Sequence, residues 1–155
     1  MTLEKYFVSK KIAIKVVAKR ADLLPSYATE GAAGADLRAN VSEDVVIPPQ
    51  KAALIPTGLF FEIPPGYEVQ VRPRSGLALK HLVHVLNSPG TIDSDYRGEL
   101  QVILMNHSDL AFTVTPGMRI AQMVIASALQ ASFELCESLN ETHRGAGGFG
   151  HTGTK

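Results

Sequence analysis

The stretch Leu59-Phe60-Phe61-Glu62-Ile63-Pro64-Pro65-Gly66-Tyr67-Glu68-Val69-Gln70-Val71-Arg72 has the pattern of short strands that indicates the fold class. Its second half alternates, so that Tyr67, Val69 and Val71 would lie on one face of a strand and polar residues on the other. Its first half is an apolar run that ends at two prolines and a glycine, which stop a strand and favour a turn. This region is therefore predicted to form two short strands separated by a turn.

The same pattern recurs along most of the chain. One short helix is predicted at 75–80, with the Ser75 hydroxyl as its N-cap. The segment 52–55 is expected to stop at Pro56. Short strands with turn residues every eight to twelve positions predict an all-β sandwich, barrel or jelly roll. The remaining predicted strands are 11–16, 31–39, 45–47, 82–86, 100–105, 111–115, 119–126 and 132–136.

Length and composition narrow the class of protein. A chain of 155 residues fits one domain, and a net charge of zero argues against a nucleic-acid-binding surface. No apolar run approaches the length of a membrane span, and the first eleven residues lack the apolar core of a signal peptide. A soluble, cytoplasmic protein is expected. The single Cys136 lies among apolar residues and is predicted to be a buried thiol.

The densest group of polar residues lies in Asn87-Ser88-Pro89-Gly90-Thr91-Ile92-Asp93-Ser94-Asp95-Tyr96-Arg97-Gly98-Glu99. Pro89-Gly90 predicts the tip of a β-hairpin. On the strand that would follow, Asp93 and Asp95 share one face and Tyr96 takes the other. Two interpretations remain open from these residues alone: capping of the turn with ion pairing to Arg97, or a carboxylate that acts as a general base or helps to hold a metal.

Three other segments have polar residues in unusual places. Arg74 and Ser75 lie where a strand meets a helix, which suits either an anion site or a capped helix with a solvated arginine. Arg119 and Gln122 interrupt an apolar strand and would face a polar site or solvent. The glycine-rich segment 141–155 suits disorder or a phosphate cradle. No His/Cys pair has zinc spacing, so Mg²⁺ on phosphates is the expected ion, and His81, His84, His107 and His143 are interpreted as structural or surface residues.

Five segments, taken in order and with their spacing, resemble the trimeric deoxyuridine triphosphatase (dUTPase) family. They are A-G-A-D-L at 33–37, P-R-S-G-L-A at 73–78, G-T-I-D-S-D-Y-R-G-E at 90–99, G-M-R-I-A-Q at 117–122 and R-G-A-G-G-F-G-H-T-G at 144–153. The match extends over nearly all of the chain after residue 10. Each segment alone is moderately specific, whereas five in register are strongly specific.

The resemblance implies an all-β, distorted jelly-roll (β-clip) subunit over residues 1–140 and a mobile, glycine-rich C-terminal arm over 141–155 that closes over a neighbouring subunit's site. It also implies a homotrimer with shared active sites, no nucleic-acid or membrane partner, and Mg²⁺ as cofactor. The implied reaction is hydrolysis of dUTP to dUMP and pyrophosphate by water attack on the α-phosphorus, which supplies dUMP for thymidylate synthesis. Two alternatives are a dCTP deaminase of the same fold family and a trimer that binds dUTP without hydrolysing it.

The resemblance also implies roles for individual residues. Asp93 would be the general base, and Tyr96 would lie under the deoxyribose and exclude a 2′-hydroxyl. The ion would be held mainly by substrate phosphates, with Asp36 near a metal-bound water or Arg144. His151 stands where many relatives have Ser. The base and sugar would be bound by Asn87, Gly90, Thr91, Ile92, Tyr96 and Phe149, and the phosphates by Arg74, Ser75, Gly76, Gln122, Arg144, Gly150, His151 and Thr152.

Overall fold

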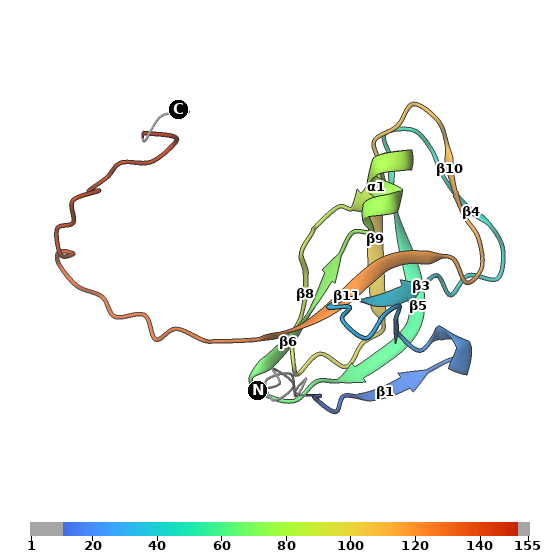
Figure 1. Ribbon diagram of the computed structural model, residues 1–155, viewed down its shortest axis with the longest axis horizontal. Coiled ribbons are helices and arrows are strands. Elements are labelled where there is room, and N and C mark those ends of the chain that lie inside the picture. The colour runs from blue at the N-terminus through green and yellow to red at the C-terminus, as the bar shows by residue number, and fades with distance from the viewer. Residues whose placement is uncertain (1–10, 152–155) are drawn as a thin grey trace, which may run out of the picture.

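The computed structural model describes residues 11–151, which form short strands, one 3₁₀ turn and one short helix (Figure 1). The elements are β1 (Lys15–Ala18), η1 (Ala21–Leu23), β2 (Ser26–Tyr27), β3 (Ala35–Arg38), β4 (Val45–Ile47), β5 (Ala52–Glu62), β6 (Tyr67–Arg72), α1 (Ser75–His81), β7 (Val83–Val85), β8 (Gly90–Ile92), β9 (Leu100–Asn106), β10 (Phe112–Val114) and β11 (Arg119–Ser127). The predicted all-β architecture is confirmed.

The strands form three sheets, with the orders β1-β5-β9-β7, β2-β3-β11-β6-β8 and β10-β4. All recorded strand pairs are antiparallel. One hydrophobic cluster contains buried residues of both larger sheets, among them Leu59 and Leu104 from one sheet and Val69 and Ile120 from the other. The two larger sheets therefore pack against each other as a β-sandwich, which agrees with the predicted jelly roll.

The predicted stop at Pro56 is wrong, because β5 continues through it from Ala52 to Glu62. Pro56 has no N–H to give to a ladder, but at this point β5 pairs only with β9, and β1 joins it only from Leu59 onward. The register with β9 also shifts between Pro56 and Leu59, as at a β-bulge. A proline is thus tolerated where the strand has one neighbour and an irregular register.

Two predictions about the central polar stretch are also wrong. β7 and β8 flank the Pro89-Gly90 turn but do not pair, because β7 belongs to the sheet of β9 and β8 to the sheet of β6. The turn therefore connects the two layers of the sandwich and is not a hairpin tip. β8 ends at Ile92, so Asp93 and Asp95 lie in a loop, and the predicted alternation of faces does not apply.

The predicted cap of the helix is a further error. Arg74, with extended backbone angles, is the N-cap of α1, and no side chain caps the helix. Ser75 is instead the first residue of the helix. At the other end, the N–H of Leu82, which has a positive φ of 55°, bonds to carbonyl groups of the last turn.

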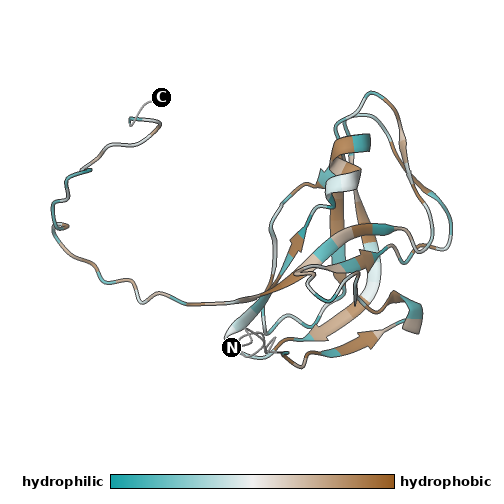
Figure 2. Ribbon diagram, viewed as in Figure 1, coloured by the Kyte–Doolittle hydropathy of each residue, from teal (hydrophilic) through white to brown (hydrophobic). Residues whose placement is uncertain are grey.

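After β11 the chain leaves the sandwich and extends away from it (Figure 1). The predicted strand at 132–136 is not formed, and Cys136 is exposed and not buried as expected. Figure 2 shows apolar residues distributed along this extended segment. Four of them, Leu129, Phe133, Leu135 and Leu139, are at least 86% exposed. Within residues 11–151, no helix has the length and apolar character that a membrane crossing requires.

Candidate functional site

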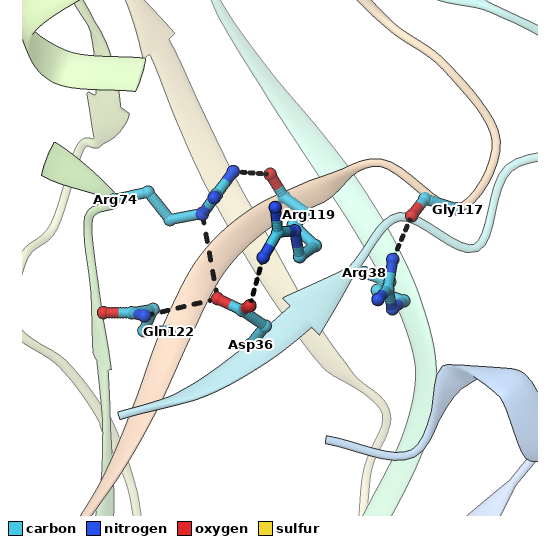
Figure 3. Close-up of polar contacts among 6 residues, drawn as sticks. All are labelled: Asp36, Arg38, Arg74, Gly117, Arg119 and Gln122. Atoms are coloured by element: carbon cyan, nitrogen blue, oxygen red, sulfur yellow. Dashed lines mark hydrogen bonds and ion pairs between the residues drawn. The ribbon is translucent and has the colours of Figure 1, made fainter. Parts of the chain in front are cut away.

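Asp36 is the centre of a polar cluster on the larger sheet (Figure 3). Its side chain is only 5% exposed, although it lies on β3 between buried apolar residues. The guanidinium of Arg119 donates a hydrogen bond from Nη1 to Asp36 Oδ2 over 3.0 Å, and the amide of Gln122 donates from Nε2 to Oδ1 over 3.2 Å. Arg74 Nε lies 3.7 Å from the same Oδ1 as an ion pair. The buried carboxylate is thus compensated by two cations and an amide.

Strand pairing explains why these residues meet although they are far apart in the sequence. β3 pairs with β11 so that Asp36 lies opposite Gln122. Between Arg119 and Ala121 the register shifts, which is the irregularity that lets Arg119 reach the same carboxylate. Arg74 follows β6, which pairs with β11 on its other side, and its Nη1 donates to the Arg119 carbonyl over 2.9 Å.

The cluster carries an excess of positive charge. One carboxylate faces two guanidinium groups, and their exposed fractions of 25% for Arg74 and 45% for Arg119 leave part of each accessible. Ser75 and Gly76 are exposed in the first turn of α1, next to Arg74, and a helix cannot satisfy its own first N–H groups. Among residues 11–151, a Cβ added at Gly76 would meet no atom within 4 Å apart from its chain neighbours and its own helix backbone, so the backbone there is open to a ligand. This arrangement suits an anion such as a polyphosphate.

A separate hollow of about 190 Å³ lies beside β8 and is lined by Thr91, Ile92, Asp93, Tyr96, Glu99 and Gln101. The loop that forms it is held by its own side chains. The Tyr96 hydroxyl donates to the Glu99 carbonyl over 3.1 Å, and Arg97 Nη1 donates to the carbonyls of Ser94 and Tyr96 over 2.7 and 3.0 Å. Glu99 Oε1 accepts a hydrogen bond of 2.7 Å from the Gly58 N–H on β5. The exposed carboxylate of Asp93 therefore lies on a loop whose conformation is stabilised by these hydrogen bonds.

One strand, β6, connects the cluster to this hollow. Gln122 on β11 lies opposite Arg72 on β6, and the neighbouring Val71 lies opposite Gly90 on β8. Since adjacent strands are about 4.8 Å apart, the backbones of β11 and β8 are separated by roughly 10 Å here. That distance is comparable to the extent of a nucleotide, so a sugar and base near β8 could place phosphates near Arg74 and Gln122.

Known proteins share both the sequence pattern and the fold of this chain. The dUTPase family model matches residues 21–153. The chain belongs to the dUTPase family. It is similar to the deoxyuridine 5′-triphosphate nucleotidohydrolase of Chlamydia pneumoniae, at 65% identity over 131 residues that cover 84% of this chain and 90% of the relative. It is also similar in fold to the dUTPase of Staphylococcus bacteriophage 80alpha with dUPNHPP, at a TM-score of 0.82 and 25% identity, covering 93% of this chain and all of that one.

A third relative concerns the metal. The structure of a mutant dUTPase from phage phi11 of S. aureus, which describes the coordination of a structural Mg(II) ion, has a TM-score of 0.72 and 23% identity over 82% of this chain and 98% of that one. Within residues 11–151 of the present chain, no group of three or more His, Cys, Asp or Glu side chains could hold a metal ion.

The structure brings together only part of the predicted site. Arg74, Gln122 and Asp36 meet in the cluster, and Thr91, Ile92, Asp93 and Tyr96 line the hollow. Asn87 is exposed near the turn, where its Nδ2 would lie 3.5 Å from a Cβ added at Gly90. The residues expected from the C-terminal arm lie on the extended segment, apart from both groups: Arg144, Phe149, Gly150 and His151. Thr152 lies outside the described residues.

Phe149 is fully exposed, and the side chain of Arg144 bonds only to the carbonyl of Gly147 among the described residues.

Three residues of the site had no predicted role in it: Arg119, Glu99 and Gln101. Arg119 was expected to face either a polar site or solvent, and its ion pair with Asp36, which depends on the β3–β11 register and the bulge, places it in the polar cluster. Glu99 closes the hollow and ties its loop to Gly58. The position of Glu99 could have indicated its role. It ends the polar stretch directly before an apolar strand, where a carboxylate requires a hydrogen-bond partner.

Proposed function

We propose that this chain hydrolyses dUTP to dUMP and pyrophosphate, as a Mg²⁺-dependent homotrimer acting on the cytoplasmic nucleotide pool. The proposal rests on two observations together: the family match over residues 21–153, and the presence on one sheet of the cationic cluster and of β8, the strand that leads directly into the Asp93 loop. In this proposal the phosphates bind at Arg74, Ser75, Gly76 and Gln122. The base and sugar bind along β8 at Asn87, Gly90, Thr91, Ile92 and Tyr96.

Asp93 acts as the general base. Its carboxylate lines the hollow, is exposed to water and has no hydrogen-bond partner for its side chain among the described residues, so it is free to accept a proton from the attacking water. The water attacks the α-phosphorus, the bond to the bridging oxygen breaks, and pyrophosphate leaves. When bound, Mg²⁺ neutralises charge on the phosphate oxygens. Asp36 orients Arg74 and Gln122, and its remaining lone pairs can accept a hydrogen bond from a metal-bound water.

The turn at Pro89-Gly90 provides the means to select the base. Gly90 is buried, and a Cβ there would lie 3.3 Å from the Cβ of Val71, so the end of the turn packs closely against β6. A turn held in this way discriminates by the pairing of its backbone groups and by steric exclusion. Hydrogen-bond mismatch can reject a wrong base by about 10⁴-fold, whereas the thymine methyl group must be rejected by a clash.

Exposed apolar residues support assembly into a trimer. Leu129, Phe133, Leu135 and Leu139 are almost fully exposed in a single chain, and burying each such side chain is worth about 1.5–3 kcal/mol. A second copy of the chain is the simplest surface on which they could pack. In the proposed trimer, residues 1–140 form the subunit body, and the arm at 141–155 brings Arg144, Phe149, Gly150, His151 and Thr152 to a neighbour's site.

The proposal is tested by incubating the purified chain with Mg²⁺ and, separately, with dUTP, dTTP, dCTP and UTP. We expect pyrophosphate and dUMP from dUTP at a rate at least about 10²-fold above that of the other nucleotides. Ammonia release from dCTP would instead indicate a deaminase, and binding of dUTP without product would indicate a silent trimer. Sedimentation velocity under the same conditions reports the oligomeric state.

A further inference from the structure

Two imidazole rings meet on the outer face of the smaller of the two packed sheets, apart from the residues proposed to bind dUTP. His84 lies on β7, and His107 directly follows β9. Their Nε2 atoms are 2.9 Å apart, while the ring centroids are 4.9 Å apart and the ring planes are parallel within 7°. Because the nitrogen atoms are closer than the centroids, the rings meet at their Nε2 edges.

The strand register holds the two rings together. His84 pairs with Met105 across β7 and β9, and the backbone N–H of His107 donates to the Leu82 carbonyl over 2.9 Å. His84 and His107 are therefore diagonal neighbours on one face, while Val83 and Val85 point into the core. His84 is half-buried and His107 is exposed, so water and ions can reach the pair.

Hydrogen bonding determines which nitrogen of His84 is available. His84 Nδ1 lies 2.9 Å from the carbonyl oxygen of Val85, which can only accept, so Nδ1 carries the proton. When the His84 ring is neutral, its Nε2 is therefore unprotonated and acts as an acceptor. In the contact between the two rings, His107 Nε2 is then the donor. If that proton moves to His107 Nδ1, both Nε2 lone pairs become available to one ion without any change in the total number of protons. A backbone carbonyl bound to the second ring nitrogen is also the usual support of a metal-binding histidine.

We propose that His84 and His107 form a bidentate site for a divalent transition metal ion, best suited to Cu²⁺. Two nitrogen ligands about 2.0 Å from an ion are about 2.8 Å apart at a right angle and about 3.3 Å apart at a tetrahedral angle. The observed separation of 2.9 Å lies within this range, so one ion can reach both nitrogens after small movements of the rings, and Cu²⁺ is the divalent first-row ion that a nitrogen site of this kind binds most tightly. Since residues 11–151 contain no group of three or more potential metal-binding His, Cys, Asp or Glu side chains, water fills the remaining positions.

An ion bound at this site would link the edge strand β7, through His84, to His107, the residue that follows β9. Neither histidine contacts Asp36, Arg74, Gln122 or Asp93 among the recorded hydrogen bonds and ion pairs of the described chain. Binding of Cu²⁺ is therefore independent of dUTP and of the proposed function. An ion that binds only the folded chain also raises its thermal stability.

The test is a titration of the full-length chain with Cu²⁺, without nucleotide or Mg²⁺, followed by calorimetry and electron paramagnetic resonance. We expect one ion per chain, an axial spectrum with coupling to two imidazole nitrogens, and a rise in Tm. In the variants His84→Gln and His107→Gln the affinity falls at least about tenfold, since losing only an orienting partner already costs 10–100-fold at many sites. His81→Gln and His143→Gln serve as matched controls and keep the wild-type affinity.

Circular dichroism establishes that each variant is folded, and Cys136→Ser is measured in parallel because an exposed thiol also binds copper. The proposal is overturned if His84→Gln and His107→Gln bind Cu²⁺ as tightly as the wild type, or if the spectrum shows fewer than two nitrogen ligands. It is equally overturned if His143→Gln or Cys136→Ser abolishes the binding. Retention of the two-nitrogen spectrum in all three control variants supports it.

Discussion

Replacing Asp36 by Asn tests whether the buried carboxylate organises the phosphate-binding residues. The change keeps the shape of the side chain but removes its charge and turns one acceptor oxygen into a donor. In one orientation the new NH₂ group faces the guanidinium of Arg119, and in the other it faces the amide of Gln122. No rotation restores both contacts, because both partners are donors.

The expected loss of stability follows from the contacts. A hydrogen bond to a charged group is worth about 1.5–3 kcal/mol and a neutral one about 0.5–1.5 kcal/mol. Arg119 is 45% exposed and the Arg74 contact is 3.7 Å long, so solvent screening reduces both ionic contributions. We expect a loss of about 2 kcal/mol in the free energy of unfolding, which corresponds to a decrease in Tm of about 4–8 °C for a chain of this size.

The expected effect on catalysis is larger. Arg74 and Gln122 lose the group that orients them, and misplacement of such groups by about 1 Å can cost up to 10²-fold. We therefore expect kcat/KM for dUTP to fall by about 10–100-fold, measured by pyrophosphate release, with Tm from calorimetry in the same buffer. Asp44→Asn is the matched control, since it removes the same charge from an exposed carboxylate without a hydrogen-bond or ion-pair partner in the described chain.

Unchanged Tm and kcat/KM in Asp36→Asn would refute this account of the cluster, whereas a lower Tm with wild-type kinetics would make Asp36 a structural residue only.

Three other predictions address separate parts of the molecule. Asp93→Asn should lower kcat by at least about 10² while KM stays near the wild-type value, because it removes the base and not a binding contact; stopped-time assays that show normal kcat would exclude Asp93 from the mechanism. Truncation before Arg144 should leave a folded oligomer with strongly reduced turnover, and aggregation of the shortened chain would show that the arm is structural. Asn106→Leu should lower stability by about 2–4 kcal/mol in urea unfolding, because its buried Nδ2 donates to the carbonyls of Ile47 and Leu110; a midpoint equal to that of the wild type would contradict this.

Short-range sequence patterns were sufficient to predict where most strands lie. Alternation and turn residues act over a few positions, so the predicted bounds of β4 and β6 agree with the structure, and the helix after Arg74 was found to within one residue. The five segments of the family pattern are also properties of the linear chain. Their order and spacing indicated the family before any contact between them was known, and the family match over 21–153 confirms that identification.

The pairing of the strands, and with it the set of side chains that meet, became visible only in the folded chain. Strand pairing is a long-range interaction, so the sequence did not show that the turn at Pro89-Gly90 joins two sheets, or that β3 and β11 bring Arg119 to Asp36. The contact of His84 with His107 likewise depends on the β7–β9 register. The predicted strand at 132–136 failed for the same physical reason: a strand requires a partner edge for its N–H and C=O groups, and among residues 11–151 this segment pairs with none.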